Sequence, residues 1–233
     1  MTLLNISTEW SAWLDWTVVS LCLAAIALYE WRTEQQRSRA PQQIARHTHG
    51  LIRANWVRHT MAKPGNEVMA VQTLRNSMMA ASITASTAIL TLMGTLSYVA
   101  PRLTETILKI SIPSTTEIIH MILLMLLAIV LFAAFVCSSM AVRFYNHLGY
   151  MMATPENDAR RAQLAELGAS YAIKAGDQYS LSLRCFFYIA PLICGLAYLP
   201  LMIPGTLALL AMLQWFNEAP IESTMLKLND SAK

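Results

Sequence analysis

The sequence contains little charge. Asp, Glu, Lys and Arg make up 13% of its 233 residues, whereas hydrophobic residues make up 55%. Soluble domains carry about 25% charged residues, so this composition argues against a water-soluble globular protein and favours helices that contact lipid. The length fits one compact helical bundle rather than two domains, and we expect a single membrane domain over residues 1–217 with a polar C-terminal tail at 218–233.

Cysteine is also scarce. The four cysteines are Cys22, Cys137, Cys185 and Cys194, and no two of them form a C-x-x-C pair. All four lie in or beside hydrophobic runs. This placement is typical of small buried hydrophobic side chains rather than of redox or metal-binding cysteines.

The motifs of common enzymes are missing. The sequence has no nucleophile elbow G-x-S-x-G, no phosphate-binding Walker loop, no dinucleotide fingerprint and no H-E-x-x-H. His120 and His147 would lie roughly 40 Å apart along one helix, and no set of His, Cys, Asp and Glu has the spacing of metal ligands. Adjacent methionines such as Met78 and Met79 fall on different sides of a helix, which favours packing over copper binding. We therefore expect no enzyme activity, no metal and no cofactor.

The most informative stretch runs from Asn76 to Pro101 and contains no Asp, Glu, Lys or Arg. A helix needs roughly 20 apolar residues to cross a membrane, so this stretch predicts a span at 77–100. Hydroxyl side chains recur along one side of it, at Ser77, Thr84, Thr87, Thr91 and Thr95. Small and hydroxyl residues let helices approach closely in lipid. The pattern favours a helix-packing face, and a face lining a solute pathway is the alternative.

Three further runs predict transmembrane helices at about 14–29, 118–142 and 185–215. The uncharged run 185–217 is long for one crossing and contains Pro191, Pro200 and Pro204. It is either one kinked span or a chain that breaks near Pro200–Pro204 into a re-entrant or hairpin form. A single kinked span is the preferred interpretation, and the fold class expected is all-α, an integral membrane protein with four transmembrane helices.

Most of the 17 Lys and Arg residues lie in the segments 30–76 and 143–184. The positive-inside rule places both segments in the cytoplasm, and four spans then put both termini outside. We expect an amphipathic helix on the anionic inner leaflet within 30–76 and a surface helix over 156–174. No cationic segment precedes the first hydrophobic run, so no cleaved signal peptide is expected.

The polar residues at the cytoplasmic ends of the spans form the candidate binding site. They are Arg53, Trp56, Arg75, Asn76, Arg143, Asn146 and His147. Arg75 begins one expected span where Arg143 ends the next, so the two ends should meet. Arginines and amides at that depth are suited to anionic lipid headgroups or another anionic ligand. Ordinary interfacial anchoring by snorkelling arginines is the simpler interpretation.

Two segments carry a family resemblance. QTLRNSMMAAS-x-x-ASTAIL begins at Gln72, and AVRFYNHLGYMMATP covers 141–155, with a weaker match over 170–215. These segments resemble the bacterial branch of the domain-of-unknown-function 599 family of integral membrane proteins. The resemblance implies a multi-span protein of the bacterial inner membrane, and it implies no activity.

The functional expectation is therefore a non-enzymatic inner-membrane protein that acts by association, as a homo-oligomer or as an accessory subunit of a larger complex. No ionisable residue lies in the middle of an expected span, which argues against a proton-coupled pump. A small-solute channel or carrier is the alternative. The expected partners are anionic membrane lipids and other membrane subunits or copies of the chain. Nucleic acid is not expected, since the net charge of +3 is concentrated in loops.

Overall fold

The computed structural model describes residues 2–39, 45–63, 65, 67–108, 114–155 and 157–217. All regular structure in these residues is helical, which confirms the all-α part of the expected fold class. The elements are α1 (Thr2–Arg39), α2 (Ala45–Ala62), α3 (Glu67–Leu108), α4 (Thr115–Met152), α5 (Arg161–Ala197), the 3-10 turn η2 (Leu199–Leu201) and α6 (Met202–Asn217). The expected tail at 218–233 lies outside the described residues.

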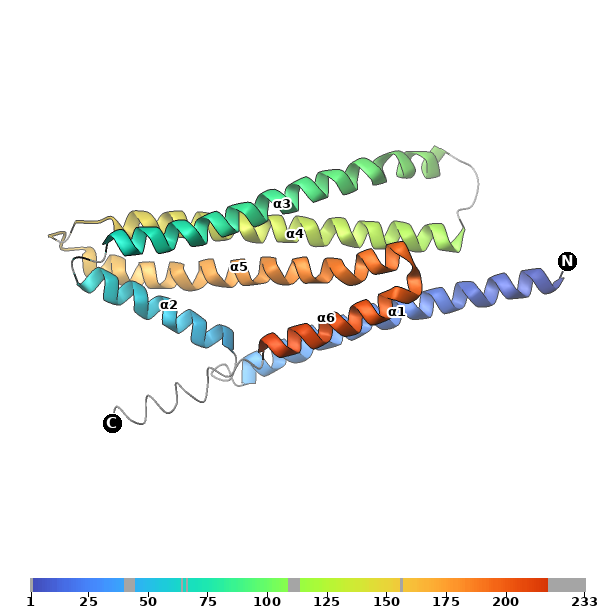
Figure 1. Ribbon diagram of the computed structural model, residues 1–233, viewed down its shortest axis with the longest axis horizontal. Helices are drawn as coiled ribbons and strands as arrows, with labels where there is room; N and C mark the ends of the chain where they lie inside the picture. Colours follow the sequence, from blue (N-terminus) through green and yellow to red (C-terminus); the bar gives the residue numbers. More distant parts are fainter. Residues whose placement is uncertain are drawn as a thin grey trace.

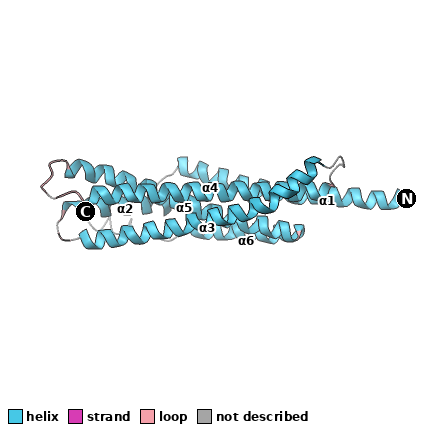
Figure 2. Ribbon diagram, turned by 90° about the horizontal axis from the view of Figure 1, so that it is seen from above, coloured by secondary structure: helices cyan, strands magenta, loops and turns pink. Residues whose placement is uncertain are grey.

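The helices α1, α3, α4, α5 and α6 run roughly along the long axis of the molecule, and α2 lies at one end (Figure 1). The helix α4 packs between α3 and α5, while α6 packs against α5, and α1 packs against α6. Successive long helices point in opposite directions, so the bundle is an up-and-down arrangement that is thin in the second view (Figure 2). The helix α6 ends beside the end of α1, far from where α1 begins (Figure 1).

Among the described residues, five helices are long and apolar enough to cross a membrane, where four were expected. They cover Trp13–Gln35, Val68–Thr104, Thr115–Met152, Arg161–Ala197 and Leu199–Phe216. The first three contain the expected spans. The additional helix comes from the C-terminal run, and five crossings would place the two ends of the bundle on opposite sides. The expectation of both termini on one side depended on an even number of spans.

The expected single kinked helix over 185–215 is wrong. The helix α5 ends at Ala197, Tyr198 is extended with φ −158° and ψ 118°, and η2 then reverses the chain into α6. Pro200 lies in η2, where its missing N–H cannot continue the ladder of α5. Pro204 lies in the first turn of α6, where no intrahelical N–H bond is lost. The break near Pro200–Pro204 is therefore a hairpin between two helices.

The two polar segments also differ from expectation. The expected surface helix at 156–174 is not separate, because Arg161–Ala197 forms one continuous helix. The helix α2 packs against α5 and is therefore not simply a helix lying on lipid. Its buried side consists of Gly50, Ala54, Val57 and Met61, while Leu51 and Ile52 are exposed. Gly50 and Ala54 on this side are small, which lets α2 approach α5 closely.

Candidate functional site at the α2 end of the bundle

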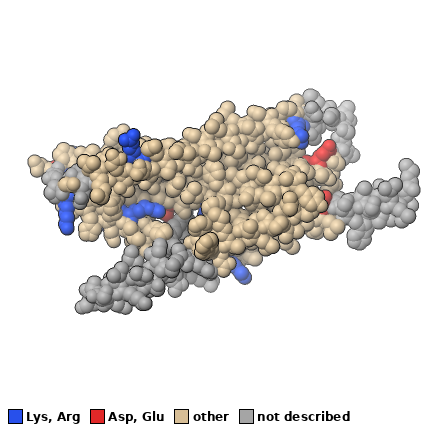
Figure 3. Space-filling model, in the orientation of Figure 1, with Lys and Arg blue, Asp and Glu red and all other residues tan. Residues whose placement is uncertain are grey.

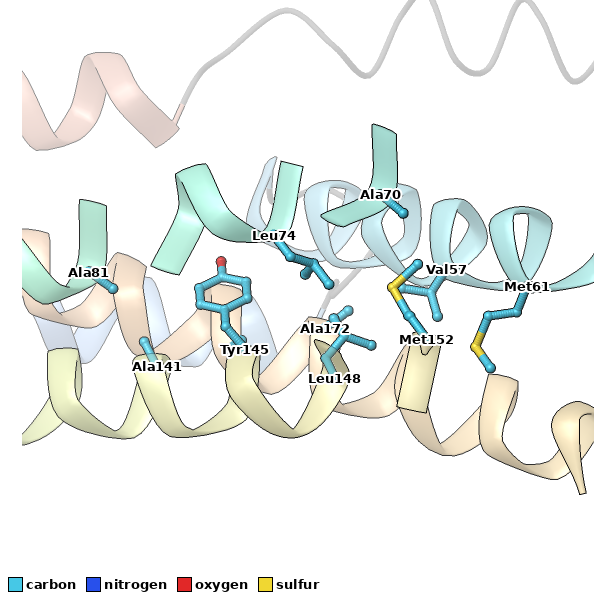
Figure 4. Close-up of a cluster of buried hydrophobic side chains, with 11 residues drawn as sticks. Val57, Met61, Ala70, Leu74, Ala81, Ala141, Tyr145, Leu148, Met152 and Ala172 are labelled. Atoms are coloured by element: carbon cyan, nitrogen blue, oxygen red, sulfur yellow. The ribbon is translucent and has the colours of Figure 1, made fainter. Parts of the chain in front are cut away.

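Four helices meet in a hydrophobic core at the end of the bundle that carries α2 (Figure 4). Every helix from α2 to α5 contributes buried side chains, and several of these are alanines. The core consists of Val57, Met61, Ala70, Leu74, Ala81, Ala141, Tyr145, Leu148, Met152, Ala172 and Ala175. The candidate polar residues lie around this core, so its packing decides which of them converge.

Arg53 points from α2 onto the backbone of α5. A Cβ atom added to Gly176 would collide with the Nη1 and Cζ atoms of the Arg53 guanidinium. Glycine at position 176 is therefore what allows the guanidinium to lie against the helix backbone. The Arg53 side chain is half-buried.

Tyr145 of α4 reaches the same place from the other side of the core. Its side chain is 8% exposed, and its hydroxyl points toward α3 (Figure 4). The phenol interacts with the hydroxyl of Ser77, and it lies close enough to Arg53 and Tyr179 for electrostatic interaction. Arg53 belongs to the candidate binding site expected at the cytoplasmic ends of the spans. The structure places it near Ser77, which the sequence assigned to the helix-packing face. Tyr145 and Tyr179 were missed, because tyrosines at a membrane boundary usually indicate anchoring.

The other six residues of the candidate binding site do not gather around Arg53. Trp56 packs against the core, and His147 makes an edge contact with Tyr171, with ring centroids 5.9 Å apart. Arg75, Asn76 and Arg143 are exposed.

Asn146 is exposed as well. Arg75 and Arg143 are both exposed, and two guanidinium groups, which only donate hydrogen bonds, could be joined only by an anion bound between them. The neighbouring residues Leu74 and Ala141 occupy the contact between α3 and α4. Since each residue turns a helix by about 100°, the side chains next to these two point away from the contact.

Only some of the hydroxyl residues along α3 pack against the rest of the chain, and the others are exposed. Each hydroxyl donates to the carbonyl oxygen four residues earlier, at distances of 2.8–3.1 Å, at Ser77, Thr84, Thr87, Thr91 and Thr95. Thr87 and Thr91 are exposed, whereas Ala81 and Ala88 are fully buried. Alanines therefore form the packing face within the chain. The threonines satisfy their own hydrogen bonds, and part of the stripe faces outward.

At the α2 end of the bundle, two arginine side chains join α2 to the beginning of α5. Arg58 of α2 donates from Nε and Nη2 to the two carboxylate oxygens of Glu166 on α5, both at 2.8 Å. Arg161 donates to the carbonyl oxygen of Met61 at 2.9 Å and also to that of Thr154, so it caps the last turn of α2. Glu166 lies in the charged half of α5, before the uncharged run that starts at Cys185. The hydrogen bond from Arg58 holds the pKa of the Glu166 carboxyl below its usual range.

A second polar cluster, missed by the sequence analysis, joins α1 to α5. Glu30 accepts a hydrogen bond from Tyr188 and lies 3.4 Å from Arg184, measured from Oε2 to Nη1. Glu30 and Arg184 have opposite charges and flank two hydrophobic runs. The two opposite charges beside hydrophobic runs are visible in the sequence. Predicting that Glu30 and Arg184 pair would have required knowing that α1 and α5 approach each other. Elsewhere in the described part of the chain, no three His, Cys, Asp or Glu side chains gather as metal ligands.

Comparison with known proteins identifies a family. A family model described as "Protein of unknown function, DUF599" matches residues 17–219, which is most of the chain. No curated protein matches the sequence, and no solved structure matches the fold.

Proposed function

We propose that this chain, which belongs to the DUF599 family of proteins of unknown function, is a non-enzymatic protein of the bacterial inner membrane that works by association. Its partners would be copies of itself or the other subunits of a larger membrane complex, for which it would be an accessory subunit. One observation carries the proposal, namely the exposed small-residue side of α3.

That side contains Thr87, Thr91 and Gly94, all exposed. A Cβ atom added to Gly94 would meet nothing within 4 Å, so nothing in the chain itself covers this place. The two threonine hydroxyls already bond to carbonyls of their own helix, which lets them lie in an apolar surrounding without an unsatisfied donor. Small side chains allow the backbone of a second helix to come close.

Burial within the chain supports the same interpretation. Only 11% of the span in α1 and 17% of the span in α3 is buried, against 39% in α4. The two outer helices thus leave most of their surface to lipid or to other proteins. In α3 large apolar side chains such as Ile83, Leu90 and Met93 flank the small ones. This alternation of ridge and gap suits helix–helix packing.

Charge supports an orientation. On the face shown in Figure 3, basic side chains lie mainly toward the α2 end, and acidic side chains lie at the opposite end near one basic patch. The positive-inside rule then places the α2 end in the cytoplasm, the beginning of α1 outside and the end of α6 inside.

A channel or carrier has less support. The sequence argument for it relied on the threonine stripe and on a break within a span. Thr87 and Thr91 point outward rather than into the bundle, and Pro200 lies in the turn between α5 and α6 rather than in the middle of a helix. Reconstituted protein is therefore expected to leave proteoliposomes impermeable, and solute flux that Thr87→Val alters would favour the channel instead.

The direct test replaces a small residue of the exposed side by a large one. Gly94→Leu adds bulk where the chain itself has free space, so the protomer should fold normally while a partner helix is kept away. Ala24→Leu on the exposed surface of α1 is the matched control. We expect Gly94→Leu to lose the oligomer or the bound subunit in native mass spectrometry and Ala24→Leu to keep it. A wild-type protein that is monomeric in mild detergent and in lipid would contradict the proposal.

A further inference from the structure

We propose that the pocket between the end of α2 and the beginning of α3 binds the headgroup of an anionic phospholipid through its phosphate. The pocket is lined by Trp56, His59, Thr60, Lys63, Met69 and Ala70. The proposal goes beyond association and does not depend on it, since Gly94 lies roughly 36 Å further along α3 than this pocket. It rests on the shape, the charge, the hydrogen-bonding groups and the apolar surroundings of the pocket.

The pocket is a hollow of about 400 Å³ between two helix ends. The chain turns at Gly65, whose φ of 96° lies in the left-handed region that favours glycine, and the last turn of α2 lies beside the first turn of α3 (Figure 1). Ala70 is buried, and Trp56 packs against the hydrophobic core at the α2 end. The base of the pocket is therefore held in place by the core.

Two basic residues border the pocket. The backbone N–H of Lys63 donates to the carbonyl oxygen of His59 at 3.2 Å, so Lys63 continues the spacing of α2 and lies on the same side as His59. Both side chains are exposed. Neither forms an ion pair with another described residue, whereas Arg58 in the same turn pairs with Glu166. The charge at the mouth of the pocket is therefore available to an anion.

Hydrogen-bond donors also line the pocket. Helical threonines of this chain commonly donate to the carbonyl oxygen four residues earlier, as Thr73 does to that of Met69 at 2.9 Å. Thr60 is half-buried, and among the described residues neither its hydroxyl nor the indole N–H of Trp56 forms a hydrogen bond. A phosphate group has enough acceptor oxygens for these two donors and for the ammonium group of Lys63.

Apolar surface continues from the pocket along α3. Val68, Met69 and Val71 are all exposed, and the part of α3 that is long and apolar enough to cross a membrane begins at Val68. The basic residues of the pocket come just before this span, at the depth where cationic side chains meet lipid headgroups. Acyl chains of the same lipid then lie along the exposed side chains of α3. This continuity favours a phospholipid over a soluble phosphate compound.

The test uses the full chain purified in detergent and titrated with phosphatidylglycerol. Diacylglycerol is the probe without phosphate, and phosphatidylcholine is the probe with phosphate but without net charge. Native mass spectrometry measures the apparent Kd of each lipid. Wild type should bind phosphatidylglycerol about tenfold more tightly than phosphatidylcholine and should retain no diacylglycerol.

A second measurement distinguishes the source of the phosphate. Delipidated protein is melted in inorganic phosphate and in chloride at equal ionic strength, with and without phosphatidylglycerol. The lipid should raise the melting temperature, and inorganic phosphate alone should not. Stabilisation by inorganic phosphate together with no retention of phosphatidylglycerol would assign the pocket to a soluble phosphate compound and overturn the proposal.

A pair of charge variants assigns lipid binding to the pocket. Lys63→Gln should weaken the binding of phosphatidylglycerol by about tenfold, the equivalent of one charge-assisted hydrogen bond. Arg32→Gln removes an exposed positive charge from α1, outside the pocket, and should bind like wild type. Equal weakening by the two variants would overturn the proposal, because that result indicates general attraction to a basic surface.

A pair of threonine variants tests the donor without changing charge. Thr60→Val should weaken binding by about threefold, the equivalent of one neutral hydrogen bond. Thr73→Val is the matched control, since the Thr73 hydroxyl already donates to its own helix. Size-exclusion chromatography and helical circular dichroism check folding, and the exposed Lys63→Gln decides the question where Thr60→Val does not fold. Wild-type affinity for phosphatidylglycerol in folded Lys63→Gln protein overturns the proposal, as does equal retention of phosphatidylglycerol and diacylglycerol by wild type.

Discussion

The hydroxyl oxygens of Ser138 and Ser182 lie 2.5 Å apart between α4 and α5, and both side chains are fully buried. Ser182 also donates to the carbonyl oxygen of Ala134 at 3.0 Å, so Ser138 is the donor in the serine pair. Two small residues at this point let the helices pack closely, and the bonds between them satisfy polar groups that lipid could not satisfy.

Removal of this pair should have unequal effects. Ser182→Ala removes the bond to Ala134 and the acceptor for Ser138, and we expect it to lower stability by about 0.6–1.7 kcal/mol. Ser138→Ala leaves Ser182 bonded to Ala134, so its effect should be smaller. Unfolding by sodium dodecyl sulfate in mixed micelles measures both, with the exposed Ser97→Ala as control. A larger effect for Ser138→Ala would contradict this assignment of donor and acceptor.

The hairpin between α5 and α6 makes a prediction about topology. If all five helices cross the membrane in the proposed orientation, the N-terminal end should lie outside and the C-terminal end inside. Epitope tags at the two ends, exposed to protease in spheroplasts and in inverted vesicles, should therefore be cleaved in different preparations. If both tags are cleaved in the same preparation, the number of crossings is even and the four-span interpretation returns.

The close contact within that hairpin should not tolerate a larger residue. A Cβ atom at Gly205 would lie 3.3 Å from the Cα atom of Pro191, which is backbone and cannot move aside easily. Gly205→Val should lower thermal stability by about 1–3 kcal/mol through overpacking. Gly149→Val is the matched control, because nothing lies within 4 Å of that position. Equal melting temperatures for the two variants would argue against tight pairing of α5 and α6.

Apolar packing rather than the exposed ion pair should hold α2 in place. Met61 is 4% exposed in the core of this end, and Met61→Ala should cost about 2–5 kcal/mol in docking α2. Hydrogen exchange of the amides of Ala45–Ala62 measures this docking. Glu166→Gln breaks the exposed pair with Arg58 and should change exchange little. Protection that falls more in Glu166→Gln than in Met61→Ala would reverse this order.

The ion pair between Arg58 and Glu166 predicts how the docking of α2 depends on pH. Because the hydrogen bond from Arg58 lowers the pKa of Glu166, the pair contributes to docking above the ordinary pKa of a free carboxyl. That contribution disappears as the pH falls through the lowered pKa, well into the acidic range. Between neutral pH and about pH 5 the exchange of α2, corrected for its intrinsic pH dependence, should stay constant. A change within that window would point to a different titrating group.

The uncharged runs at 77–100 and 118–142 predicted two of the spans well, because each is long enough to cross a bilayer by itself, whereas the run at 14–29 is shorter and α1 continues beyond it at both ends. The prediction of a single span in the C-terminal run was wrong for a physical reason. Neither Cys185–Ala197 nor α6 is as long as the other spans, and α5 is completed on its charged side by Arg184. That arginine is acceptable there because Glu30 of α1 pairs with it. A hydropathy pattern in one helix cannot show a counter-charge that lies in another.

For the candidate site, the sequence could predict only the depth of its residues in the membrane. The sequence placed Arg53, Arg75 and Arg143 at one level, and the level alone does not say which side of its helix a residue occupies. Convergence on Arg53 depends on Gly176, whose missing side chain leaves room for the guanidinium. Glycine within a helix carries no pattern of its own, so this contact became visible only in the structure.

The most direct test of the association proposal is native mass spectrometry of the protein extracted gently from its own membrane, repeated in lipid nanodiscs. The account predicts a fixed oligomer or a defined complex with other membrane subunits, which Gly94→Leu loses and Ala24→Leu retains. A protein that appears as a monomer in both preparations would contradict the account.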